Sequence, residues 1–480
     1  MKKILIIFTI FLTFSACTKL EDLNKNTKDP SIVPGELLFT GAQKNIFDIM
    51  VTPNVNQNIF RMFTQQWTET TYTDESNYDL VTRSIPDNFW DAIYLNILKN
   101  LKESKRLISE KEYVNEAPAI KKNKLAIIEV LSVYAWGTLV ETFGNIPYSE
   151  ALDVTNETPA YDDGLTVYKD LISRLNTAIA DMDPSEGSFD SGDNMYGGDV
   201  AAWYKFANSL KLHMGMILSD VTAESALAKT IIEDAAPNVF TSNADNAVLP
   251  YSDDAQSNSN PVYTDLVASG RHDFVPANTL VDYMDTLGDP RMPFYFTYKT
   301  GTTTYVGGIF GMLNRYSKCS HVSSPIQAAT FEGMIFDYAE VEFLLAEAVE
   351  RGYNIGSGTA ADHYNAGITA SMEYWGVAPA DIATYLAKPE IAYSSTSWKE
   401  KIGIQQWFAY YNRGFEAWTE WRRLDFPVLV APPNAKSVIP LRYTFPVEEQ
   451  TLNAANFNAA VSALGAGGDA VSHKLFWDKN

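Results

Sequence analysis

Cysteine and histidine are scarce in this chain of 480 residues, which has two cysteines and five histidines. The cysteines are Cys17 and Cys319. A modified Cys17 would leave Cys319 without a disulfide partner, so stability has to come from packing. The histidines are scattered and form neither an HExxH pattern nor another paired-ligand spacing. This spacing excludes the common zinc hydrolase signatures, and we predict no metal site.

Basic residues are also in short supply, since 37 lysines and arginines face 59 aspartates and glutamates, for a net charge of −22. Nucleic acids and anionic lipid surfaces both require a basic face, so neither is expected as a partner. Nucleophile elbows, phosphate loops and dinucleotide fingerprints are missing as well, and we predict no cofactor. The segment 181–186 begins like a calcium loop, but Glu186 stands where such a loop needs glycine.

Long hydrophobic runs are confined to the N-terminus. Lys2 and Lys3 precede an apolar stretch over residues 4–14, which ends before Ser15, Ala16 and Cys17. This pattern predicts a lipoprotein signal peptide over residues 1–16, with Cys17 as the lipidated first residue of the mature protein. An ordinary secretory leader is the alternative. The next most apolar stretch, 125–140, is interrupted by Glu129, as in a buried helix, so the lipid anchor is the only membrane element predicted.

Helical periodicity dominates the rest of the chain. Residues 17–34 are polar and contain Pro30 and Pro34, which predicts a tether before one large domain over residues 35–480. Apolar residues recur every three or four positions, so the domain is expected to be mainly α and built from helical hairpins. The expected helices are 35–47, 89–101 paired with 119–142, 165–182 paired with 200–218, 331–349 paired with 361–374, and a region over 398–420.

The middle of the chain has a different composition. Residues 240–330 are rich in Asn, Asp, Ser, Gly and aromatic residues, and show no helical period for most of their length. This predicts long irregular loops, where binding residues are often found.

Several short strings resemble the SusD/RagB family, in particular its SusD-like branch. They occur in the order found in that family and run nearly from end to end: 28–38, 143–151, 196–199 with 203–212, 260–263, 289–291, 338–348, 420–423 and 439–446. The resemblance implies a helical fold with tetratricopeptide-like helix pairs and irregular ligand-binding loops. It also implies a non-catalytic lipoprotein of the outer membrane, facing the cell exterior, that binds oligosaccharide and delivers it to a SusC-like TonB-dependent transporter. Glu21 and Asp22 resemble the acidic export cue of such lipoproteins.

Two pairs of glutamates bear on whether the protein is an enzyme. Glu340 and Glu347 share one helix face, as do Glu416 and Glu420. Paired carboxylates can hydrolyse a glycosidic bond, so a secreted glycoside hydrolase stays an alternative. On amphipathic helices such pairs are more often solvated or engaged in salt bridges, and we predict no catalytic residue.

A protein that captures sugars would use aromatic faces on loops, because the C–H face of a sugar stacks on an aromatic ring while its hydroxyls need polar neighbours. Residues 65–78 interleave aromatic and polar side chains and form the leading candidate, followed by the long middle segment. The predicted ligand-binding residues are Trp67, Tyr72, Tyr78, Tyr251, Tyr263, Arg271, Tyr305 and Tyr316. A peptide ligand is the alternative within the same family, since Arg271 could bind a charged terminus. A structural helical adaptor without a ligand is a further alternative.

Overall fold

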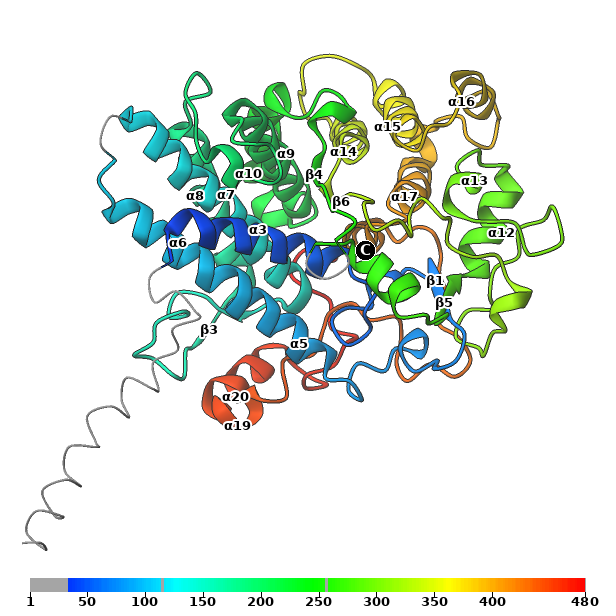
Figure 1. Cartoon of the computed structure of the whole chain (residues 1–480), viewed down its shortest axis with the longest axis horizontal. Helices are drawn as coiled ribbons and strands as arrows, with labels where there is room; N and C mark the ends of the chain where they lie inside the picture. Colours follow the sequence, from blue (N-terminus) through cyan, green and yellow to red (C-terminus); the bar gives the residue numbers. More distant parts are fainter. Residues whose placement is uncertain (1–32, 114–115, 255–257, 480) are drawn as a thin grey trace, which may run out of the picture.

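The computed structural model describes residues 33–113, 116–254 and 258–479 (Figure 1). The predicted signal peptide, Cys17 and nearly all of the tether lie outside the described residues. The first described helix, α3 (Gly35–Val51), begins at the predicted residue. It packs against α6 (Lys99–Glu110), which continues a π-helical turn over Ala92–Leu98 and α5 (Ile85–Asp91). The predicted helix 89–101 is therefore the middle of a longer helical run.

The longest helix lies in the core. α7 (Pro118–Phe143) is long and apolar enough to cross a membrane, but 94% of its most apolar window is buried within the protein. Glu129, the acid in the middle of this helix, forms ion pairs with Lys105 and Arg174, at 2.5 Å in each case. Burial opposes the charge of Glu129, but these two cations outweigh it and lower the pKa of its carboxyl. A helix that is apolar on all sides is thus a core helix here.

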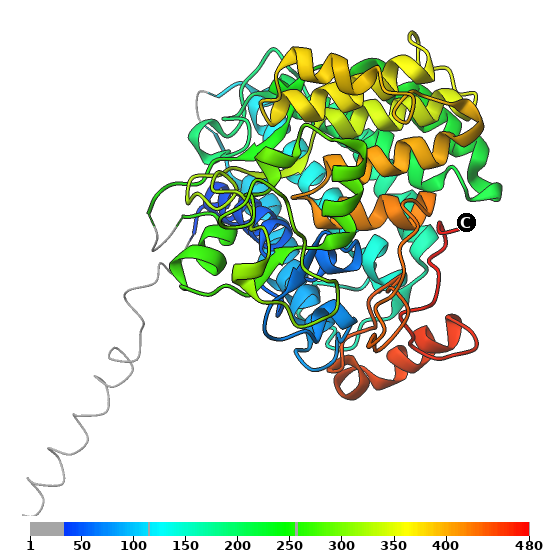
Figure 2. The ribbon, with the colours of Figure 1, turned by 90° about the vertical axis from the view of Figure 1, so that its right-hand side faces the viewer.

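Antiparallel helix pairs make up most of the fold, and they lie next to one another in Figure 1. The pairs are α7 with α8 (Gly164–Asp181), α9 (Val200–Leu218) with α10 (Ser225–Ala235), α14 (Tyr338–Glu350) with α15 (Ala360–Tyr374), and α17 (Trp398–Ala409) with α18 (Gly414–Leu424). Figure 2 shows the yellow and orange helices of the last two pairs stacked in layers. The predicted class, mainly α with tetratricopeptide-like pairs in a single domain, is confirmed.

One detail of the predicted pairing is wrong. The main partner of α8 is α7, because α9 packs chiefly against α10, which was not predicted. The predicted helical region over 398–420 consists of two helices, since the chain turns at Tyr410–Arg413 before α18. Gly414 permits this turn: a Cβ atom there would lie 2.8 Å from the backbone nitrogen of Arg61, on α4 (Phe60–Phe63). Close backbone approach of this kind requires glycine.

The remaining elements are short. The middle segment is irregular for most of its length, as predicted, but it also holds α12 (Asn278–Leu287), with the shorter α11 (Pro261–Tyr263) and α13 (Met292–Tyr295). Further helices are α16 (Pro379–Leu386), α19 (Glu449–Leu452) and α20 (Ala454–Ala463). Three two-stranded antiparallel sheets join β1 (Trp67–Glu69) to β5 (Phe274–Pro276), β2 (Ile146–Pro147) to β3 (Tyr161–Asp162), and β4 (Ala247–Leu249) to β6 (Gly333–Phe336).

Candidate functional site

The pairing of β1 with β5 brings the two predicted binding segments together. Trp67 lies opposite Pro276 and Glu69 opposite Phe274. Beyond the strands the contact continues, because the Thr70 amide donates a hydrogen bond to the Asp273 carbonyl at 2.8 Å. Tyr72 and Arg271, separated by about 200 positions in the sequence, therefore lie at the same edge.

A polar cavity lies at this edge. Its volume is about 170 Å³, and a neighbouring hollow of about 350 Å³ shares two of its lining residues, Asn54 and Asp265. Together they form a polar groove. The side chains of the first cavity that can recognise a polar ligand are Glu69, Tyr72, Arg83, Asp265, Arg271 and Asp273.

Aromatic rings stand beside the cavity. The ring of Tyr316 stacks between those of His272, at 4.3 Å and 17°, and His321, at 3.7 Å and 9°. His272 lies between Arg271 and Asp273, which both line the cavity, whereas the three stacked rings do not line it themselves. Tyr72 is 55% exposed and presents its phenol to solvent. We call Tyr72, Arg271, His272 and Tyr316 the aromatic face.

Tyr305 lies on the same loop segment as Tyr316, but it does not line the cavity. Its ring packs on that of Tyr298, at 4.6 Å between centroids. Tyr298 is 51% exposed and was not predicted. Tyr263 is half-buried on α11, between Pro261 and Thr264, which line the neighbouring hollow.

Three predicted ligand contacts are buried and need correction. Trp67 is 0% exposed, with the Arg61 guanidinium 5.1 Å from its ring centroid. Tyr78 accepts a hydrogen bond from Gln65 at 3.1 Å, and Tyr251 donates one to Asp48 at 2.8 Å. Both tyrosines are buried as well. Their ring faces are covered by protein, so these residues hold the loops in place and cannot stack on a ligand.

The protonation state of Glu69, on the cavity wall, depends on the nearby carboxyl group of Glu75. Burial and the nearby Glu75 raise the pKa of Glu69 to about 9, although Ser76 donates two hydrogen bonds to it, at 2.9 and 2.8 Å. Glu75 forms an ion pair with Arg83. At neutral pH, Glu69 is therefore protonated, and its proton is engaged by the carboxylate of Glu75. A neutral carboxyl, two guanidinium groups and exposed rings suit an uncharged polyhydroxylated ligand.

Comparison with known proteins identifies the family. Residues 25–446 match the SusD-like family described as "Starch-binding associating with outer membrane". The chain belongs to this SusD-like family. No curated protein sequence matches it.

Solved structures share the SusD-like fold over nearly their whole length. A chitin-binding protein is 27% identical, with a TM-score of 0.79, and the match covers 93% of this chain and 99% of that one. A chitin-binding SusD homologue from Flavobacterium johnsoniae is 25% identical, with a TM-score of 0.79 and coverage of 92% and 99%. A SusD homologue from Bacteroides uniformis is 26% identical, with a TM-score of 0.77 and coverage of 92% and 99%.

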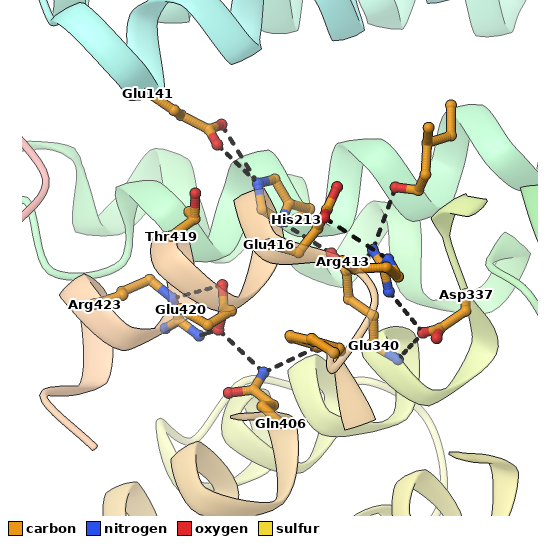
Figure 3. A network of polar contacts seen from close by, with 12 residues as sticks. Glu141, His213, Asp337, Glu340, Gln406, Arg413, Glu416, Thr419, Glu420 and Arg423 are labelled. Atoms are coloured by element: carbon orange, nitrogen blue, oxygen red, sulfur yellow. Dashed lines mark hydrogen bonds and ion pairs between the residues drawn. The ribbon is translucent and has the colours of Figure 1, made fainter. Parts of the chain in front are cut away.

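The paired glutamates of this SusD-like protein are salt-bridge partners, and they are buried instead of solvated. Figure 3 shows three of them, Glu340, Glu416 and Glu420. Arg423 of α18 forms ion pairs with both Glu347 and Glu420. Gln406 also donates a hydrogen bond to Glu420, at 3.0 Å. Glu416 lies 3.8 Å from the guanidinium of Arg413, which also pairs with Glu340. Each carboxylate is thus held by a cation in the core, away from the polar groove.

The second half of this network surrounds His213 (Figure 3). Its two ring nitrogens lie 3.4 Å from Glu141 and 3.3 Å from Glu340, and Arg413 forms ion pairs with Glu340 and, at 3.0 Å, with Asp337. Burial opposes the charge of His213, but the two carboxylates outweigh it and raise its pKa well above the usual range. A charged His213 in this place balances buried acids. Among the described residues, no group of three or more His, Cys, Asp or Glu side chains could hold a metal ion.

Proposed function

We propose that this SusD-like protein binds oligosaccharide at the cell surface without catalysis and delivers it to a TonB-dependent transporter of the outer membrane. The observation that carries the proposal is the aromatic face beside a polar cavity, in a chain similar to chitin-binding proteins at 27% and 25% identity. A hydrolase would need two carboxyls that flank the bound sugar, whereas the paired glutamates here are engaged in buried ion pairs.

The aromatic rings and the polar side chains of the cavity would recognise different parts of a sugar. The C–H face of a sugar unit would stack on Tyr72, since both faces of the Tyr316 ring are covered by His272 and His321. Its hydroxyls would donate to Asp273 and accept from Arg271, both of which line the cavity. A neutral ligand suits this set, because the protein carries a net charge of −22.

The predicted lipid anchor would place the binding domain at the outer membrane. A lipidated Cys17 would hold the domain at the outer membrane, with the tether over residues 17–34 as the spacer. A SusC-like transporter is the proposed partner, with the domain acting as a lid over its mouth.

Calorimetry with chito-oligosaccharides and malto-oligosaccharides of increasing length tests the proposal on the full chain in detergent. We expect Tyr72→Ala and Arg271→Ala each to weaken binding by about tenfold, as for residues at the centre of a binding site. Tyr204→Ala is the matched control, since Tyr204 is half-buried on α9 and lines neither hollow. Equal affinity in all the variants would contradict the aromatic face. Binding of a peptide panel alone would favour the peptide alternative, and release of shortened sugars would favour the hydrolase.

A further inference from the structure

A second groove lies away from the aromatic face. Its volume is about 540 Å³, within the range of about 300–1,000 Å³ that is usual for ligand pockets. It shares no lining residue with the polar cavity or its neighbouring hollow. The lining residues come from the turn before β6, the end of α15, α13 and the segment after β4: Pro250, Phe294, Pro325, Ala328, Thr330, Phe331, Glu332, Tyr374 and Trp375.

The floor of this groove is aromatic. Trp375 caps the C-terminus of α15, and Gly376 follows in the left-handed region with φ of 84°, so the helix ends where the indole reaches the groove. The rings of Trp375 and Phe331 are nearly parallel, at 22°, with centroids 5.9 Å apart. Tyr295 packs edge-on against the indole at 4.8 Å and fixes its orientation. Trp375 and Phe331 remain only partly buried.

A carboxylate stands beside these rings. Tyr374 donates a hydrogen bond to one oxygen of Glu332 at 2.9 Å. No other hydrogen bond to Glu332 is formed by the described residues, so its second oxygen can accept one from a ligand. Thr330 adds a hydroxyl to the wall. The groove therefore offers apolar faces together with hydrogen-bond acceptors.

The charged side chains next to the groove indicate which class of ligand it can bind. A small cavity of about 20 Å³ shares Phe331, Glu332, Tyr374 and Trp375 with the groove and is also lined by Asp337 and Arg413. Arg413 is buried and already paired with Asp337. Glu332 is thus the charged group left to face a ligand, and it repels anions. A ligand needs an apolar face for the indole and hydroxyl or amide donors for Glu332, which describes a neutral sugar unit.

We propose that this groove is a second carbohydrate-binding site, which takes a sugar unit of an oligosaccharide against Trp375 and Phe331, with its hydroxyls donated to Glu332. The site goes beyond the proposed function, because it lies on residues separate from the aromatic face. Two sites on one molecule would let a long oligosaccharide, or two chains, be held at once, which raises the effective concentration at each site.

The test uses the full chain in detergent with Tyr72→Ala as the background, so that the aromatic face is weakened. Calorimetry with the same chito-oligosaccharides and malto-oligosaccharides is expected to detect binding to the Tyr72→Ala protein. Adding Trp375→Ala to this protein is expected to weaken that binding by about tenfold. Glu332→Gln keeps the shape of the groove and removes its charge, and is expected to weaken binding by severalfold. Trp398→Ala is the matched control, since Trp398 is a partly buried indole outside the groove.

Two results would overturn this second site. One is that Trp375→Ala and Glu332→Gln leave the affinity for every sugar unchanged while thermal melting shows both variants folded. The absence of any sugar binding in the Tyr72→Ala background would count in the same way. The other is that a basic peptide binds the groove and no sugar does. Failure of the proposed function has a different signature: Tyr72→Ala and Arg271→Ala alone would leave binding unchanged, whatever happens at Trp375.

Discussion

Arg423 and Glu347 form a fully buried ion pair in which both guanidinium Nη atoms face both carboxylate oxygens, although the residues are 76 positions apart. The pair joins α18 to α14, and thus connects two of the helix pairs. Removing Arg423 takes one of two cations from Glu347, which also pairs with Arg351 at 2.7 Å, and removes the ion pair of the buried Glu420. We expect Arg423→Ala to lower the free energy of unfolding by about 3–5 kcal/mol, as measured by chemical denaturation.

Arg106 is the matched control for this pair. It lies on α6, is half exposed, and pairs with Glu103 and Glu110 on the surface. Solvent screens such pairs, so Arg106→Ala is expected to change the free energy of unfolding by less than about 1 kcal/mol. Similar losses in both variants would mean that the buried pair contributes no more than a surface one.

Glu69 is expected to make stability fall as the pH rises. Its pKa is about 9 in the folded protein, against an ordinary value of 4.5, so between these pH values the folded state holds a proton that the unfolded state has released. Stability from this group is complete below pH 4.5 and is lost as the pH rises towards 9, by up to about 1.4 kcal/mol per pH unit. Glu69→Gln should remove this slope in denaturation curves measured from pH 5 upward. Glu103→Gln, at an exposed position on α6, should leave the slope unchanged.

Two helical glycines are expected to respond in opposite directions to alanine. A Cβ atom at Gly367 on α15 would lie 2.9 Å from the buried ring of Phe343 on α14, whereas a Cβ atom at Gly137 on α7 would meet nothing within 4 Å. Gly367→Ala should destabilise the fold by about 1–3 kcal/mol through overpacking. Gly137→Ala should stabilise it by about 0.5–1 kcal/mol through helix propensity. Thermal or chemical denaturation measures both, and equal signs would contradict the close contact of α14 with α15.

Trp67 and Tyr72 are five positions apart but are expected to affect different properties. Trp67→Ala empties a buried site and should lower the free energy of unfolding by about 3–5 kcal/mol. Tyr72→Ala removes an exposed ring and should change the free energy of unfolding by less than about 0.5 kcal/mol. The same substitution is expected to weaken ligand binding. Denaturation and calorimetry on both variants check this division. A stable Trp67→Ala protein with lost binding would restore Trp67 as a ligand contact.

Cys17 is predicted to hold the protein on the membrane. In the native host, Cys17→Ser is expected to move the protein from the membrane fraction to the soluble fraction, because the acyl chains can no longer be attached. Cys319→Ser is the matched control, since Cys319 is buried within the domain. Membrane retention of the Cys17→Ser protein would favour the ordinary secretory leader and another means of attachment.

The helices could be predicted from the sequence because their apolar faces repeat within each segment. The residues over 35–47 and 119–142 fall within α3 and α7, and Glu129 correctly indicated a buried helix. The partner of α8 could not be predicted in this way, since the period within a helix does not specify which helix covers it.

At the candidate site, the two segments could be predicted from the sequence, but the side chains that reach the cavity could not all be predicted. Tyr72 and Arg271 line the cavity and Tyr316 stacks on the neighbouring His272, whereas Trp67, Tyr78 and Tyr251 are buried. A segment that alternates aromatic and polar residues has two faces, and composition does not indicate which of them meets solvent. His272 and Tyr298 lie in the same middle segment but were not among the predicted residues, because the sequence does not indicate which of its rings are exposed. Trp375 was missed for a related reason, since it lies just beyond a predicted helix.

The sequence by itself determined the helical class, the acidic charge, the predicted export signal and the motifs that resemble the SusD/RagB family, because each depends on local order along the chain. Only the tertiary structure decided which aromatic rings are exposed and which acids are neutralised. Glu340 and Glu347 could be placed on one helix face from their spacing, but their arginines lie 73 and 76 positions away. Burial and charge pairing depend on what packs against a face, and that is set by contacts between distant segments.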